Sequence, residues 1–110
     1  MRYLSRKRGG TAVVGGWDPR ARGAIRAARR GGLRVPEDFS VVGYDDSPLI
    51  AFTDPPLTTV RQSVQAMSEA AVRALLEEIS GEPAPRAEFI FRPELVVRSS
   101  TGACRSRSFT

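Results

Sequence analysis

The chain has 110 residues, of which 41% are hydrophobic and 26% are charged, and it carries a net charge of +5. This length allows one modest domain, and the composition excludes a disordered chain or a coiled coil. With a single cysteine and no histidine, the sequence also excludes an internal disulfide and the usual zinc sites. We therefore expect no metal and no other cofactor.

The positive charge gathers at the two ends of the chain. Its end residues are Arg2, Arg6, Lys7, Arg8, Arg105 and Arg107. Two interpretations stay open: solvated basic tails, which we favour, and a nucleic-acid-binding arm that releases counterions from phosphate. No apolar run approaches the roughly 20 residues of a membrane span, and no apolar segment of a signal peptide follows the basic start. A cytoplasmic protein without membrane contact is expected.

The first predicted elements are a strand and a helix. Thr11–Gly15 is a Val-rich run bounded by glycine, typical of a strand that is buried on both faces. Asp18 followed by Pro19 indicates an N-cap and the first helical position, so a helix is expected over Pro19–Arg30. Its apolar stripe consists of Ala21, Ala24, Ile25 and Ala28.

A second buried strand is predicted at Ser40–Tyr44. The strand, helix and strand span about thirty residues, the size of a parallel βαβ unit, and this favours the α/β class with helices flanking a parallel sheet. Ligands of such sheets bind beyond the carboxyl ends of the strands. Because Asp18 follows the first strand and Asp45 and Asp46 follow the second, these acids are expected to line one edge.

Prolines predict an irregular connection after that strand, and a helix begins near Ser63. Gly81 ends the helix, and Pro93 divides the last apolar stretch into two predicted short strands. The apolar positions of the helix are predicted to be core residues: Val64, Met67, Ala71, Val72, Leu75, Leu76 and Ile79.

Three stretches resemble the LacI/GalR family of bacterial transcriptional regulators: "WDPRARGAIRAARRGGLRVPEDFSVVGYDD", "DPPLTTVRQSVQAMSEAAVRALLEEISGE" and "RPELVVRSST". The resemblance covers residues 11–101 and corresponds to the C-terminal part of the effector-binding domain. It implies part of a type I periplasmic-binding-protein-like fold. Residues 1–10 are expected to form a basic tail outside the resemblance, and residues 102–110 are expected to form a disordered tail. The family's DNA-binding headpiece and most of its first subdomain are expected to be missing, so the sequence is interpreted as a fragment.

The resemblance also implies a site. In the family the strand-end acid of the "GYDD" motif, here Asp45, reaches a small effector, usually a sugar or related polyol. Asp18 matches the second member of an Asn-Asp pair at the same cleft, and Trp17 stands where the Asn is usual. Gln62 lies on the segment that crosses near the cleft. Asp45, Asp18, Gln62 and Trp17 are therefore candidate effector contacts, while Asp46 is expected to be a turn residue or to start a helix.

Family members act as homodimers that bind operator DNA through the headpiece. The resemblance places Leu49, Ile50 and Phe52 near the subunit interface, with local packing as the alternative. Enzymatic chemistry is not expected, since the sequence has no histidine, nucleophile elbow or phosphate-binding loop. Two other functions stay open: a fragment of a sugar-binding transport protein of the same fold, and a small basic nucleic-acid-binding module.

Overall fold

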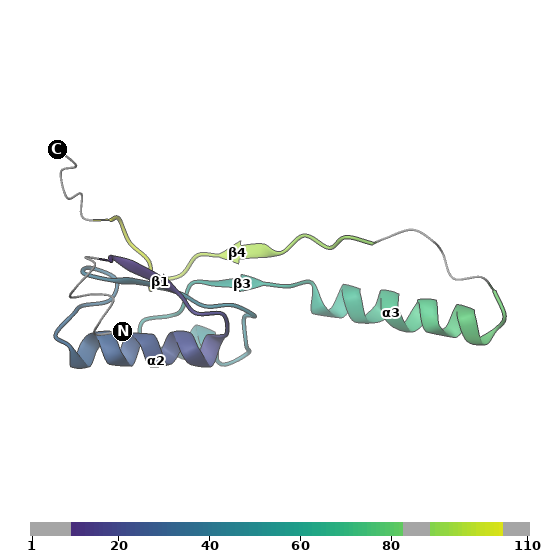
Figure 1. The fold of residues 1–110 in the computed structure, drawn as a ribbon, viewed down its shortest axis with the longest axis horizontal. Helices are drawn as coiled ribbons and strands as arrows, with labels where there is room; N and C mark the ends of the chain where they lie inside the picture. The colour runs from purple at the N-terminus through teal and green to yellow at the C-terminus, as the bar shows by residue number, and fades with distance from the viewer. Residues whose placement is uncertain (1–9, 83–88, 105–110) are drawn as a thin grey trace. The chain divides into compact units, whose positions relative to one another are not determined.

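The computed structural model describes residues 10–82 and 89–104. The chain divides into two compact units, with boundaries after Arg61 and after Glu94. The first unit contains the two ends of the described chain and the second contains residues 62–94. Figure 1 shows the order of the elements along the chain.

The first unit is built on a strand–helix–strand arrangement. Strand β1 (Ala12–Val14) and strand β2 (Ser40–Val42) are parallel, with Val13 opposite Val41, and helix α2 (Asp18–Arg30) connects them (Figure 1). The predicted βαβ unit and α/β class are confirmed. The chain continues through a short 3-10 helix at Ile50–Phe52.

Two further strands, β3 and β4, form a second two-stranded sheet. Strand β3 (Thr59–Arg61) pairs with strand β4 (Glu94–Val96), and a parallel bridge joins Val42 of β2 to Thr58. The amide of Gly43 donates to the carbonyl of Thr58 at 2.8 Å, which extends the contact to the end of β2. The segment after β2 and the segment before β3 are thereby held side by side.

The core of the first unit lies between α2 and the strands. Alanines at helical spacing let the backbone of α2 approach β2 closely, and larger side chains from the loops and β2 fill the remaining space. The buried hydrophobic residues are Ala21, Ala24, Ile25, Ala28, Val35, Phe39, Val41, Ile50 and Leu57.

The prediction that β1 is buried on both faces is wrong. Ala12 and Val14 are exposed, Val14 by 69%, and only Val13 packs against the core. Successive side chains of a strand point to opposite faces, and only the face that carries Val13 packs against the core. A Val-rich run reports that a strand has two apolar faces, but not whether both faces have a neighbour.

The second unit consists of helix α3 (Val64–Ile79) and the chain that follows it. The helix is confirmed, but the prediction that its apolar residues form a core is wrong, because α3 has no buried residue in the described structure. The most exposed of its large apolar side chains, Ile79, is 73% exposed. Phe89 and Phe91 line a hollow on the alanine side of α3 instead.

The prediction of two strands around Pro93 is also corrected. Residues 89–92 form no strand, and only β4 follows, while the start of this stretch lies outside the described residues. In the predicted C-terminal tail, the amide of Gly102 donates to the hydroxyl of Ser40 at 3.1 Å, and Cys104 lies 3.4 Å from the hydroxyl of Thr11. Residues 105–110 and 1–9 lie outside the described part. Within that part no helix is long and apolar enough to cross a membrane.

Candidate functional site

The acids predicted at one sheet edge do lie together. The amide of Asp18 donates to the carbonyl of Tyr44 at 3.2 Å, and the amide of Ser47 donates to the Asp18 carboxylate at 2.7 Å. The start of α2 and the turn after β2 are thus joined directly. This edge is the carboxyl end of the parallel sheet, where α/β proteins bind ligands.

Asp18 is fully buried, and it is not the N-cap of α2. The helix begins at Asp18 itself, with Trp17 at the N-cap and no capping hydrogen bond from a side chain. Instead, one carboxylate oxygen of Asp18 accepts from the amide of Ser47 and the other accepts from the hydroxyl of Thr59 at 2.9 Å. These bonds, together with the positive end of the α2 dipole, compensate the buried charge.

Gly43 makes room for this carboxylate. A Cβ atom added at Gly43 would overlap Oδ1 of Asp18 and would lie 2.8 Å from a methyl carbon of Leu57. Since both neighbours are fully buried, neither has free space to move into. The buried position of Asp18 therefore requires glycine at position 43, in the "GYDD" motif. Sequence reasoning missed this relationship.

Asp45 differs from Asp18 in being exposed to solvent. Its backbone has a φ of 112°, a region that L-residues rarely adopt, and its amide donates to the carbonyl of Val60 at 2.8 Å. A polar side chain held in an unfavourable backbone conformation at a sheet edge is a feature of binding sites. Its carboxylate accepts hydrogen bonds, and hydroxyl groups are suitable donors.

Asp46 is more than the turn residue that was predicted. One carboxylate oxygen accepts from Nε of Arg61 at 2.7 Å and the other from an Nη atom of Arg98 at 2.8 Å. Burial by itself would raise the pKa of Asp46, but the hydrogen bonds and positive charges of Arg61 and Arg98 outweigh it and hold the pKa below its ordinary value. Sequence reasoning did not identify Arg98, because no local pattern links it to residues fifty positions earlier.

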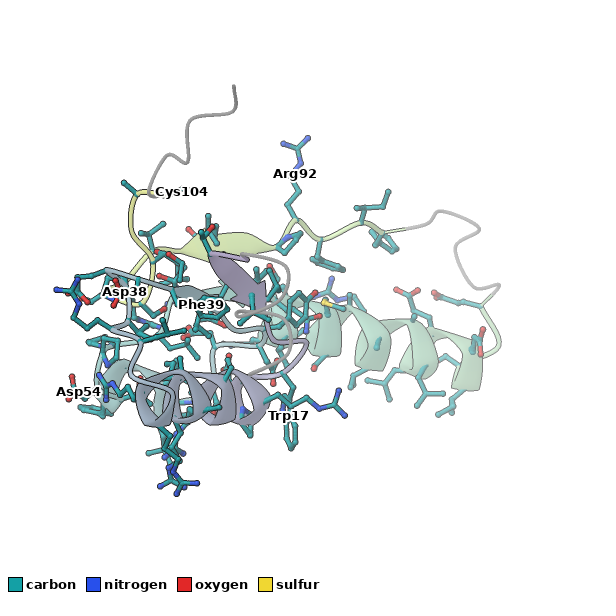
Figure 2. The ribbon with its side chains drawn as sticks, turned by 60° about the vertical axis from the view of Figure 1, so that its left-hand side comes forward. Trp17, Asp38, Phe39, Asp54, Arg92 and Cys104 are labelled. Atoms are coloured by element: carbon teal, nitrogen blue, oxygen red, sulfur yellow. The ribbon has the colours of Figure 1, made fainter. Side chains whose placement is uncertain are left out.

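Trp17 and Gln62 are the other two predicted contacts. Trp17 lies beside Asp18 at the start of α2, 54% exposed, and Figure 2 shows its ring pointing away from the helix. Gln62 is half-buried and is the first residue of the second unit. Trp17, Asp18 and Asp45 all belong to the first unit, and the described hydrogen bonds join Asp18 to the turn that carries Asp45.

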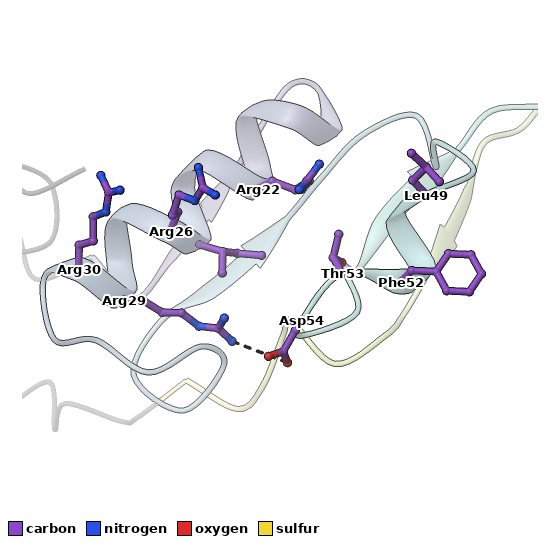
Figure 3. A pocket seen from close by; sticks show the side chains of 9 residues that line it. Arg22, Arg26, Arg29, Arg30, Leu49, Phe52, Thr53 and Asp54 are labelled. Atoms are coloured by element: carbon purple, nitrogen blue, oxygen red, sulfur yellow. Dashed lines mark ion pairs between the residues drawn. The ribbon is translucent and has the colours of Figure 1, made fainter.

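A separate hollow of about 650 Å³ lies between α2 and the segment after β2. Four arginines of α2 line one side, and Leu49, Phe52 and Asp54 line the other (Figure 3). Its lining arginines are Arg22, Arg26, Arg29 and Arg30. Arg29 forms an ion pair of 3.9 Å with Asp54 between exposed side chains.

The residues predicted near a subunit interface separate into two kinds. Leu49 and Phe52 are 70% and 85% exposed, as an interface requires, whereas Ile50 is 3% exposed and belongs to the core. Ile50 is therefore corrected to a packing residue. The difference arises because the 3-10 helix turns Ile50 inwards and its two apolar neighbours outwards.

In the described residues no cluster of acids, cysteine or histidine is arranged to hold a metal ion.

A model of the periplasmic binding protein-like domain family matches residues 2–101. The sequence predicted a start at residue 11, and that boundary stays a prediction. The HTH-type transcriptional regulator MalR of Streptomyces coelicolor is 71% identical over 93 residues, which are 84% of this chain and 27% of that protein. The chain therefore spans about a quarter of the length of MalR.

Solved structures agree with this assignment. A complex of the transcriptional regulator CelR with cellobiose superposes with a TM-score of 0.80 at 37% identity, over 88% of this chain and 30% of that one. The lac repressor dimer bound to operator and an anti-inducer gives a TM-score of 0.77 at 39% identity, over 84% and 32%. The chain belongs to the periplasmic binding protein-like domain family and represents part of the effector-binding domain of a LacI/GalR-type transcriptional regulator.

Proposed function

We propose that the chain contributes the strand-end half of a site for a small polar effector, a sugar or related polyol, and that Asp45 contacts the effector directly. The observation that carries this proposal is the exposed carboxylate of Asp45 at the carboxyl end of β2, on a backbone with a φ of 112°. An acceptor at this position suits a ligand rich in hydroxyl groups.

Two further features support a sugar. Trp17, which precedes Asp18 at the start of α2, is 54% exposed, and an aromatic face stacks on the apolar face of a sugar ring. The similar CelR structure is a complex with cellobiose. Among the other predicted contacts, Asp18 supports the turn from within, because both its oxygens are already bonded inside the protein. Gln62 remains a candidate contact on the segment that follows β3.

In this proposal, effector binding controls a DNA-binding headpiece that these 110 residues do not include. The similar regulators carry the HTH-type designation, and the lac repressor structure is a dimer on its operator. For this chain we propose a homodimer through the surface formed by Leu49, Phe52 and the adjoining face of α2. Both side chains are exposed and apolar, and the hollow beside them offers space for a partner's side chains.

The effector proposal is tested by NMR titration of the ¹⁵N-labelled chain with cellobiose, sucrose and glucose. We expect saturable shifts of the Asp45 and Asp46 amides and the Trp17 indole, with weak affinity because the chain spans only about a quarter of the length of the similar regulator MalR. Asp45→Asn should weaken binding at least tenfold, as expected when a charged acceptor of a hydrogen bond is lost.

Asp38→Asn is the matched control, since Asp38 pairs with Arg34 in the same unit. It should leave the titration unchanged. Shifts confined to the hollow lined by Phe89, or saturable binding that Asp45→Asn does not weaken, would contradict the role of Asp45.

A further inference from the structure

We propose that Asp46 is the positioning residue of the effector site: held by Arg61 and Arg98, it fixes the turn that presents the Asp45 carboxylate to solvent. This inference rests on the proposed function for the importance of Asp45. The contacts that support it belong to the first unit alone.

The turn after β2 is strained and needs support. Asp45 and Asp46 follow each other with φ values of 112° and 53°, and neither is glycine. Residues other than glycine, asparagine and aspartate rarely adopt such φ angles, and aspartate adopts them only at a cost in free energy. Such a conformation persists only where the surrounding structure determines it from several sides.

Asp46 supplies that support through both carboxylate oxygens. Arg61 bonds one oxygen at 2.7 Å and Arg98 bonds the other at 2.8 Å, and the Asp46 side chain is only 13% exposed. Charge-assisted bonds of this length are strong, and screening by water is limited at this exposure. Arg98 is itself anchored, because its second Nη atom donates to the carbonyl of Leu57 at 2.9 Å.

The two arginines come from two different crossings of the chain. Arg61 is the last residue of the first unit before the chain enters the second, and Arg98 follows soon after the chain returns at Leu95. On the other side of the turn, the Asp18 carboxylate holds the amide of Ser47. Two carboxylates therefore fix the turn: that of Asp46, which binds the two arginines, and that of Asp18, which binds Ser47. The Asp45 side chain between them in sequence stays at the surface.

Amide hydrogen exchange on the ¹⁵N-labelled chain, without any effector, tests this inference. The Asp45 amide is bonded to the Val60 carbonyl at the strained turn, and the Val41 amide is bonded to the Ser100 carbonyl in the core. In Asp46→Asn we expect exchange at Asp45 to become at least tenfold faster while exchange at Val41 changes less than twofold. Asp38→Asn, which weakens the 3.0 Å ion pair with Arg34, should change the exchange rate of neither amide.

A milder pair of variants covers the case in which Asp46→Asn does not fold. Arg61→Gln removes one of the two supports and should accelerate exchange at Asp45 about threefold, whereas Arg61→Lys, which keeps the charge, should recover most of the protection. Unchanged exchange at Asp45 in Arg61→Gln and Asp46→Asn, or an equal acceleration at Val41, would overturn the positioning role. Because no effector is present, a failed sugar titration leaves this result intact and rejects only the proposed function.

Discussion

The hydroxyl of Thr59 donates to the carboxylate of Asp18 at 2.9 Å, and both residues are fully buried. This bond joins the first turn of α2 to β3 across 41 residues of sequence. It makes Asp18 an internal support of the sheet edge at which Asp45 is exposed.

Asp18→Ala should lower the free energy of unfolding by about 3 kcal/mol, because it leaves the Ser47 amide and the Thr59 hydroxyl without their acceptor. Thr59→Val should lower the free energy of unfolding by less, about 1 to 2 kcal/mol. Urea unfolding followed by Trp17 fluorescence measures both values. In a double-mutant cycle the two changes should couple by at least about 1 kcal/mol; additive losses would show that the bond contributes little.

Gly43→Ala should destabilise the first unit by about 1 to 3 kcal/mol, since the new methyl group overlaps the Asp18 carboxylate and crowds Leu57. Gly23→Ala is the matched control. Gly23 lies in the interior of α2 with no atom within 4 Å of an added Cβ, so this change should raise stability by about 0.5 to 1 kcal/mol. Thermal unfolding followed by circular dichroism distinguishes the opposite signs; a loss at both positions would disagree with the packing described around Gly43.

Asp45→Gly should make the protein more stable while removing effector binding. Glycine accepts a φ of 112° without strain, and we expect a gain of about 1 kcal/mol in the free energy of unfolding. Asp45→Ala lacks the carboxylate but keeps the strain, so it should lose binding without gaining stability. Urea unfolding and sugar titration of both variants provide the comparison, and a destabilised Asp45→Gly protein would argue against a strained turn.

The free energy of unfolding should decrease at acid pH, in part because Asp46 becomes protonated. The pKa of Asp46 is lower in the folded protein than in the unfolded chain, so its contribution is fully present above the unfolded pKa of about 4 and is lost as pH falls through the folded value. Unfolding free energies measured from pH 7 to pH 2 should show a gap between wild type and Asp46→Asn that narrows below about pH 4. A gap that stays constant with pH would mean that the charge of Asp46 does not stabilise the fold.

Mutations of Leu49, Ile50 and Phe52 should differ in their effects, although the three residues are close in sequence. Phe52→Ser and Leu49→Ser should weaken self-association at least tenfold in analytical ultracentrifugation without changing the circular dichroism spectrum, because both side chains are exposed. Ile50→Ala should instead cost about 3 kcal/mol of stability, as expected for a buried isoleucine. Unaltered association in the two serine variants would exclude this surface as the interface.

Several features of the fold follow from local sequence. The Val-rich runs, the Asp-Pro start and the alanine stripe predict β1, α2 and β2 within a few residues, because strand and helix periods and proline geometry act over short distances. The same patterns place Asp18 and Asp45 at one sheet edge, since parallel strands carry their carboxyl ends on the same side. Helix α3 is predicted in the same way, from apolar residues three and four positions apart.

The order and type of the main elements, and the family to which they belong, could be predicted from the sequence alone, since both depend on short-range periodicity and on motif order. The role of each acid is visible only in the folded chain: Asp18 is enclosed beside Gly43, Asp45 faces solvent, and Asp46 is held by two arginines. The exposure of the apolar residues of α3 is likewise visible only there. Burial and ion pairing depend on partners tens of residues away, and a pattern read along the chain does not contain those partners.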